Sequence, residues 1–220
     1  MWEACAGKAN LAGLRGDGER AAHLTAQAER TGQLSGNISL LNGVQLARGL
    51  AALGSERPGQ AHHELNRMMD RQDSAYHMPQ SVWALDYVAE AATACGHVDE
   101  ARGVLRDIEA VTGTTTSPGV RRTLALTRLL LAEDDDMEQR FTEATTLGAA
   151  ASPWYRARVN LAYGAWLRRQ RRVVASRGPL RAAQTVFDAL AAPAWTARAI
   201  RLLLTASARQ TGGRHHRWAA

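Results

Sequence analysis

The feature that most constrains this chain is an internal repetition of about 40 residues. Ala21, Ala61 and Ala101 each open a stretch with helical periodicity, and their positions lie 40 residues apart. A turn that contains glycine precedes each stretch, at Gly16–Gly18, Gly54–Gly59 and Gly96. A repeat of this length accommodates a helix, a short turn, a second helix and a longer loop. The sequence therefore predicts a series of helix pairs.

The clearest pair lies between Met78 and Gly113. Its first helix is predicted from Pro79, because proline suits a first helical position, to Gly96, which suits a helix end. An apolar stripe recurs there at three- and four-residue spacing, at Val82, Leu85, Ala89, Ala92 and Cys95. The second helix opens with Asp99 and Glu100, and carboxylates favour the positive end of a helix dipole.

The two faces of this second helix follow from the same spacing. Its apolar face is predicted at Val98, Ala101, Leu105 and Ile108. Its solvent-exposed face is predicted at Arg102, Arg106, Asp107 and Glu109. Ala101 is expected where the two helices of the pair approach most closely, so a larger side chain there would overpack the contact.

Further helices are predicted at 3–14, 19–31, 37–53, 59–71, 118–132, 136–147, 153–170, 174–190 and 194–208. Ser117-Pro118 and Ser152-Pro153 each combine a capping residue with a proline at a helix start. One helix pair cannot bury its own apolar face, so neighbouring pairs must stack. We predict an all-α fold, an α-solenoid of stacked antiparallel helix pairs over residues 1–207, with a basic, disordered tail over residues 208–220.

Composition agrees with a helical protein and leaves the meaning of the charge open. Alanine, leucine and arginine dominate, and only 5% of residues are aromatic. The net charge of +6 suggests an acidic partner or nucleic acid, but the charge is spread over helices, which favours ordinary solvated arginines. The same two interpretations apply to a basic cluster at Arg168, Arg169, Arg171, Arg172, Arg177 and Arg181. It has no base-reading pattern, so we expect no sequence-specific nucleic-acid binding.

Three short stretches resemble catalytic or nucleotide-binding motifs, and each fails. Ala6-Gly7-Lys8 lacks the earlier glycine and the following Ser or Thr of a phosphate loop. The stretch from Gly16 to Ala21 nearly spells a dinucleotide fingerprint but follows a helix rather than a strand. His63-Glu64 begins a zinc-protease motif, but Arg67 stands where its second histidine belongs. We predict no catalytic residue, no cofactor and no enzyme.

Metal-binding patterns are equally weak. Cys5 and Cys95 fit no metal spacing, and His62-His63 and His215-His216 are adjacent pairs, which we interpret as solvated surface histidines. The acidic run from Glu133 to Asp136 is predicted to cap the next helix rather than to bind a cation. No metal site is therefore predicted. The absence of a long apolar stretch and of a signal peptide predicts a cytoplasmic protein with reduced cysteines.

Two stretches resemble known families. Gly96-His97-Val98-Asp99-Glu100-Ala101, with the apolar residues that follow, resembles the turn and second helix of a tetratricopeptide repeat. The stretch from Ser152 to Arg169 resembles the final repeats of the large ATP-binding LuxR-family transcriptional regulators of the MalT type. The residues from Pro179 to Ala183, from Phe187 to Leu190 and from Pro193 to Ala199 continue that resemblance in order.

The resemblance implies the sensor or interaction repeat region of such a bacterial regulator, which binds an effector or a partner protein through residues that the sequence does not identify. Those regulators also carry an ATPase module and a helix-turn-helix, whose residues are missing here, so we expect a truncated chain. The first alternative is a free-standing helical-repeat interaction scaffold unrelated to transcription. The second is an enzyme whose site assembles only in space.

Overall fold

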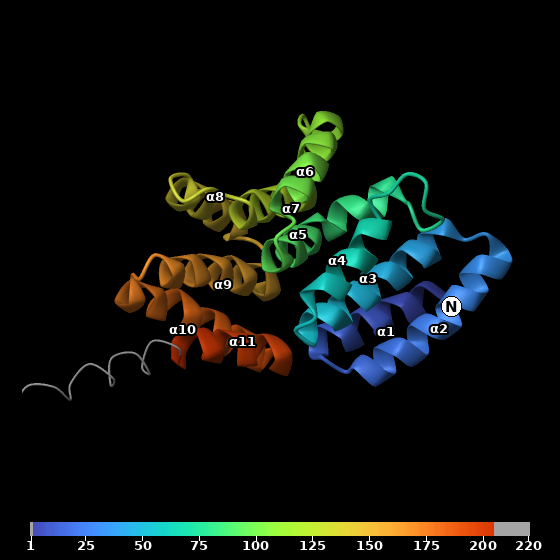
Figure 1. Ribbon diagram of the computed structural model, residues 1–220, viewed down its shortest axis with the longest axis horizontal. Coiled ribbons are helices and arrows are strands. Elements are labelled where there is room, and N and C mark those ends of the chain that lie inside the picture. The colour runs from blue at the N-terminus through green and yellow to red at the C-terminus, as the bar shows by residue number, and fades with distance from the viewer. Residues whose placement is uncertain (1, 205–220) are drawn as a thin grey trace, which may run out of the picture. The chain divides into compact units, whose positions relative to one another are not determined.

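The computed structural model describes residues 2–204, with side chains from Ala6 onward, and the described part consists of helices and the loops between them, without strands. The all-α prediction is therefore confirmed. The helices, labelled in Figure 1, are α1 (Trp2–Arg15), α2 (Gly18–Ser35), α3 (Ile38–Gly54), α4 (Pro58–Arg67), α5 (Met78–Cys95), α6 (Val98–Thr112), α7 (Pro118–Leu130), α8 (Met137–Gly148), α9 (Pro153–Arg169), α10 (Val173–Ala189) and α11 (Pro193–Leu204).

Most predicted boundaries lie within two residues of the observed ones, and two internal boundaries differ more. Helix α2 continues to Ser35, where Gly36 with a φ of 63° ends it. Helix α4 ends at Arg67 rather than at residue 71. The Arg67 side chain there donates a 2.8 Å hydrogen bond to Asp73, which favours a turn over a continued helix. The end of the last predicted helix and the predicted tail 208–220 lie outside the described residues.

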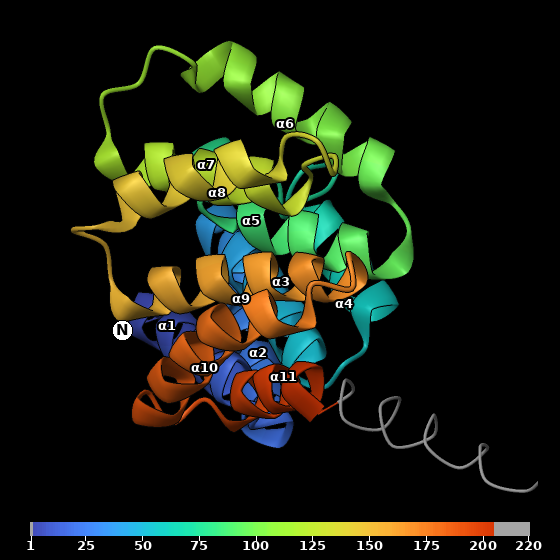
Figure 2. The ribbon, with the colours of Figure 1, turned by 90° about the vertical axis from the view of Figure 1, so that its left-hand side faces the viewer.

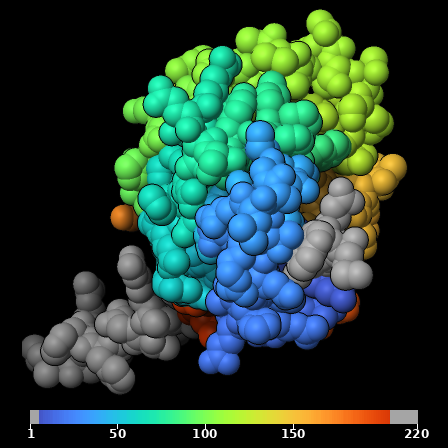
Figure 3. Space-filling view, turned by 90° about the vertical axis from the view of Figure 1, so that its right-hand side faces the viewer, coloured from blue at the N-terminus to red at the C-terminus, as the bar shows by residue number. Residues whose placement is uncertain are grey.

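The chain divides into two compact units, residues 1–147 and residues 148–220. In the first unit each helix from α1 to α7 contacts the next, and the first helices of successive pairs, α1, α3, α5 and α7, also contact one another. The blue, teal and green segments of this unit follow one another in chain order in Figure 3. In the second unit α10 packs against both α9 and α11, as Figures 1 and 2 show.

The 40-residue period recurs in the helices and in their buried positions. Helices α2, α4 and α6 begin at positions 18, 58 and 98, and helices α3, α5 and α7 begin at positions 38, 78 and 118. The fourth, eighth and eleventh positions, counted from the first residue of α2, α4 and α6, are all buried: Ala21, Thr25 and Ala28; Ala61, Leu65 and Met68, which directly follows α4; Ala101, Leu105 and Ile108. In the second unit, Ser176, Leu180 and Ala183 of α10 occupy the same places and are also buried.

Glycine allows the two helices of a pair to approach closely at equivalent positions. A methyl group on Gly49 of α3 would clash with Leu65 of α4, and one on Gly164 of α9 would clash with Leu180 of α10. Each glycine is the twelfth residue of its helix, and each leucine is the eighth of the next. A Cβ at either glycine would have to displace its partner leucine, because packed interiors have little spare volume.

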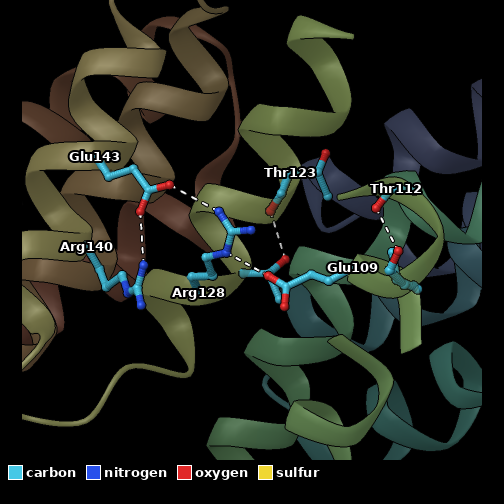
Figure 4. A network of polar contacts seen from close by, with 8 residues as sticks. Glu109, Thr112, Thr123, Arg128, Arg140 and Glu143 are labelled. Carbon is cyan, nitrogen blue, oxygen red and sulfur yellow. Dashed lines mark hydrogen bonds and ion pairs between the residues drawn. The ribbon is translucent and has the colours of Figure 1, made fainter. Parts of the chain in front are cut away.

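Equivalent Glu–Arg ion pairs join successive helix pairs at the first and third junctions of the first unit. At the first junction, between α2 and α3, Glu29 lies 2.6 Å from Arg48. At the third junction, between α6 and α7, Glu109 lies 2.7 Å from Arg128, and these positions follow the first pair by two 40-residue periods. Figure 4 shows Arg128 between Glu109 and Glu143 of α8, with a Glu143 oxygen 3.1 Å away.

The second junction, between α4 and the α5–α6 pair, differs from the other two. Its corresponding positions hold Met69 and Val88, which cannot form an ion pair. Val88 is fully buried, and Met69 packs against the apolar cluster of α5 and α6. The polar contacts between α4 and the α5–α6 pair therefore come from side chains at other positions.

Arg102 and Glu109, which were predicted to face solvent, are only partly exposed, whereas Arg106 and Asp107 are exposed as predicted. The Arg102 guanidinium donates hydrogen bonds to the Leu131 carbonyl at 3.0 and 3.3 Å and lies 3.4 Å from Glu133. The last carbonyls of a helix lack partners within it, so the Leu131 carbonyl directly after α7 accepts hydrogen bonds from Arg102 across the third junction. Periodicity within one helix cannot predict a partner on the next pair.

Candidate functional site

A cavity of about 310 Å³ lies along three successive first helices of the first unit, α1, α3 and α5. We call it the amide groove. Its walls include Ala6 and Asn10 of α1, Asn42 and Leu46 of α3, and Gln80 and Trp83 of α5. None of its lining residues is charged. The groove is therefore suited to an uncharged or apolar ligand with some hydrogen-bonding groups.

Side-chain amides supply the polar atoms of the groove. Asn42 is buried and donates to the Ala75 carbonyl at 2.9 Å, and Gln80 Nε2 donates to Ser39 Oγ at 2.6 Å. Asn10 Oδ1 and Gln80 Oε1 are buried and accept no hydrogen bond from the described residues. A buried acceptor without a donor is costly, so a ligand with N–H groups would gain free energy at both places.

A second cluster gathers side chains from three segments of the first unit. It contains His62 of α4, Cys95 at the end of α5, His97 directly before α6 and Glu100 in the first turn of α6. The ligand atoms of His62, Cys95 and His97 all lie within 4.8 Å of one another. Glu100 Oε2 lies 3.6 Å from His62 Nε2 and 3.3 Å from His97 Nδ1. We call these four residues the His-Cys cluster.

The two imidazole rings of the His-Cys cluster are stacked, with centroids 4.5 Å apart and an angle of 23° between the planes. His62 is buried, and this burial lowers its pKa more than the Glu100 carboxylate raises it. Asn66 Nδ2 lies 3.2 Å from His62 Nε2 and donates to Glu100 Oε1 at 2.6 Å. Asn66 therefore links the His62 ring to the Glu100 carboxylate.

The sequence did not predict the His-Cys cluster, and the interpretation of His62 as a solvated residue is wrong, since only 8% of it is exposed. Its neighbour His63 is exposed, as predicted. His62 lies 33 residues before Cys95, a separation that no metal motif covers. The signal that could have found it is the 40-residue period, which places the first turns of α4 beside the turn that follows α5.

Two of the other candidate motifs take the local structures expected of them. Ala6-Gly7-Lys8 lies inside α1, which excludes a phosphate loop there. Gly16 has a φ of 78°, and the Asp17 side chain accepts a 3.1 Å hydrogen bond from the Arg20 N–H, so this stretch is a helix-capping turn. The acidic run from Glu133 to Asp136 directly precedes α8, and its Glu133 pairs with Arg102.

The predicted basic cluster lies in the second unit, around the turn between α9 and α10. Arg168 is half-buried, and Arg169, Arg171, Arg172, Arg177 and Arg181 are exposed. The Arg172 guanidinium lies 5.5 Å from the centre of the Trp166 ring, an arrangement typical of a cation–π contact.

The charge is spread over helices, as expected, but its sign differs between the two units. Residues 1–147 hold 14 basic and 20 acidic side chains, a net charge of −6. Residues 148–204 hold ten arginines and one acidic residue, Asp188, a net charge of +9. Any acidic partner of this chain would therefore be attracted to the second unit, and a cation to the first.

Comparisons with known proteins leave the family open. No family model, no curated protein and no solved structure matches this chain. None of the helices among residues 2–204 is long and apolar enough to cross a membrane. The amide groove and the His-Cys cluster are therefore the features of this protein that indicate a function.

Proposed function

We propose that this chain is a helical-repeat binding region, an α-solenoid of tetratricopeptide-like pairs, and that its amide groove binds a segment of a partner protein. The observation that carries the proposal is the groove itself. Three successive first helices line it, it bears no charge, and it offers two unpaired amide acceptors. Peptide N–H groups can satisfy such acceptors, while Trp83, half of whose surface is exposed, can pack against an apolar side chain.

The repeated helix positions support the tetratricopeptide-like interpretation. Equivalent buried residues recur at 40-residue intervals through α2, α4 and α6, and the helices of successive pairs contact one another in the order that a stacked array requires. In such arrays the helices of successive repeats form an extended binding surface, which is where the amide groove lies.

The resemblance of residues 152–199 to the final repeats of MalT-type regulators supports a place for this binding region in transcriptional control. In that role the chain binds an effector or partner protein and carries no catalytic site. The reading frame that encodes the chain tests this part of the proposal. A phosphate loop encoded upstream or a helix-turn-helix encoded downstream, in frame, would support a regulator, and a frame with neither would favour the free-standing scaffold.

Peptide selection tests the groove. Peptides selected from a random library on the purified chain should bind the wild type, and Asn10→Ala and Gln80→Ala should each weaken binding about tenfold, because one hydrogen bond to a buried acceptor contributes roughly 1–1.5 kcal/mol. Gln33→Ala, at an exposed site on α2, is the control and should leave the affinity unchanged. Equal affinity for all four proteins by calorimetry would show that the groove is not the binding site.

A further inference from the structure

The His-Cys cluster combines side chains that commonly bind metal ions. One thiol, two imidazoles and a carboxylate are the ligand types of zinc sites, and neither the proposed peptide binding nor the ion-pair pattern of the fold uses them. We propose that His62, Cys95, His97 and Glu100 form a zinc site that joins the helix pair α3–α4 to the pair α5–α6.

The distances suit a small tetrahedral ion. Zinc bonds of about 2.0–2.3 Å place the ligand atoms of a tetrahedral site roughly 3.2–3.8 Å apart. Glu100 Oε2 already lies at such distances from one nitrogen of each ring, 3.3 Å from His97 Nδ1 and 3.6 Å from His62 Nε2. The ligand atoms of His62, Cys95 and His97 lie within 4.8 Å of one another. Because the two imidazole rings are stacked, binding of the ion requires the rings to rotate so that a nitrogen of each faces it. On binding, the Cys95 thiol loses its proton to solvent and the thiolate coordinates the ion.

The surroundings hold the ligands in place and leave a path for the ion. Asn66 donates a 2.6 Å hydrogen bond to Glu100 Oε1, which fixes the carboxylate with its other oxygen toward the histidines. An open cleft of about 700 Å³, lined by His62, Asn66 and Glu100 among others, connects the cluster with solvent. The negative charge of the first unit also favours the approach of a cation.

The repeat supplies an independent argument. His62 is the fifth residue of α4, and Arg102, the fifth residue of α6, binds the Leu131 carbonyl and Glu133 beside the turn that follows α7. This helix position therefore joins one pair to the turn of the next. At the second junction the fifth helix residue is a possible metal ligand, His62. At the same junction Met69 and Val88 stand where the first and third junctions have a Glu–Arg ion pair.

Cobalt and zinc titrations of the full chain test the site. After treatment with a chelator, the protein should bind one Co²⁺ with the visible bands of a tetrahedral ion and a thiolate charge-transfer band in the near ultraviolet, and Zn²⁺ should abolish both. Cys95→Ser should lose the charge-transfer band. His62→Ala should weaken binding by at least the roughly 10–100-fold that changes in outer-shell residues cost.

Matched controls separate this site from other thiols and histidines. Cys5→Ser, His63→Ala and the double variant His215→Ala/His216→Ala should bind the metal as the wild type does, and circular dichroism without metal should show equal helix content in all variants. Zinc at a hundredfold excess over its Kd should raise the Tm of the wild type by about 5–10 °C, but not that of Cys95→Ser. A wild type without the thiolate band, or a band lost in Cys5→Ser instead, would overturn the proposal.

Discussion

The second and third junctions of the first unit join equivalent helices through different chemistry. At the third junction Arg102 binds a helix-end carbonyl, and Arg128 pairs with Glu109 at 2.7 Å. At the second junction the same helix position holds His62, which lies against Cys95, His97 and Glu100 instead. The difference teaches that the repeat determines where a side chain meets the next helix pair, while the residue at that place determines what the contact can do.

The ion pair of the third junction and the proposed zinc site of the second junction respond to different solution conditions. Half-buried ion pairs contribute about 0.2–1 kcal/mol each and weaken with salt. A bound zinc ion stabilises the folded state in proportion to the logarithm of its free concentration, by about 2.7 kcal/mol at a hundred times its Kd. At constant salt the stability of the third junction is therefore fixed, whereas the proposed zinc site would make the stability of the second junction depend on the concentration of free zinc.

The largest predicted effect tests whether the two junctions share one backbone geometry. Ala61 and Ala101, the fourth residues of α4 and α6, are 0% and 1% exposed. Ala61→Leu and Ala101→Leu should each overpack the core and lower the free energy of unfolding by roughly 1–3 kcal/mol. Ala110→Leu, at an exposed site on α6, is the matched control and should change it by about 0.5 kcal/mol or less. Chemical denaturation in the presence of a chelator measures all three.

If either buried alanine tolerated leucine as well as Ala110 does, the two second helices would not pack equivalently. The comparison between His62 and Arg102 would then lose its structural basis.

A smaller effect is expected where the sequence and the structure disagree. Arg102→Leu should lower the free energy of unfolding by about 1–2 kcal/mol, because the Leu131 carbonyl loses its donor. Arg106→Leu, one helical turn further along α6, is exposed and should have little effect. Equal stability of the two variants would show that the hydrogen bond across the third junction contributes nothing.

The contrast between Arg102 and Arg106 shows how far the sequence could predict this molecule. Helix positions and the buried alanines followed from local signals: glycines, prolines and apolar spacing within a single helix. The partner of Arg102 and the burial of His62 depend on which turn of the following pair lies opposite, and this is a tertiary contact. The 40-residue period contains that information only once the pairs are known to stack, so the His-Cys cluster could not be found by motif spacing alone.

A still smaller effect is expected when salt is used to distinguish the contacts of the third junction from those of the second. A double-mutant cycle with Glu109→Gln and Arg128→Gln should give a coupling of about 0.5–1 kcal/mol at low ionic strength, since both side chains are about 30% exposed. The coupling should fall by more than half at about 1 M salt, where the Debye length is near 3 Å. Replacing the corresponding residues of the second junction, Met69 and Val88, by alanine should give a coupling that salt does not weaken.

The smallest predicted effect concerns acid and the first junction. A hydrogen bond from Arg48 is the main cause that lowers the pKa of Glu29 below its usual value of 4.5. A carboxylate with a lower pKa in the folded state binds fewer protons there than in the unfolded chain. Its stabilising contribution is therefore present above about pH 4.5 and is lost as the pH falls through the folded-state pKa.

Glu29→Gln measures this contribution. Because Glu29 is only partly buried, the variant should be less stable than the wild type by about 0.5 kcal/mol near pH 7, and the two should become equal once the pH has fallen below the folded-state pKa of Glu29. In an Arg48→Gln background the same substitution should have no pH-dependent effect, because the donor is gone. A difference that persists unchanged at low pH would mean that Glu29 acts through packing. The first and third junctions would then not share the ion pair that distinguishes them from the second.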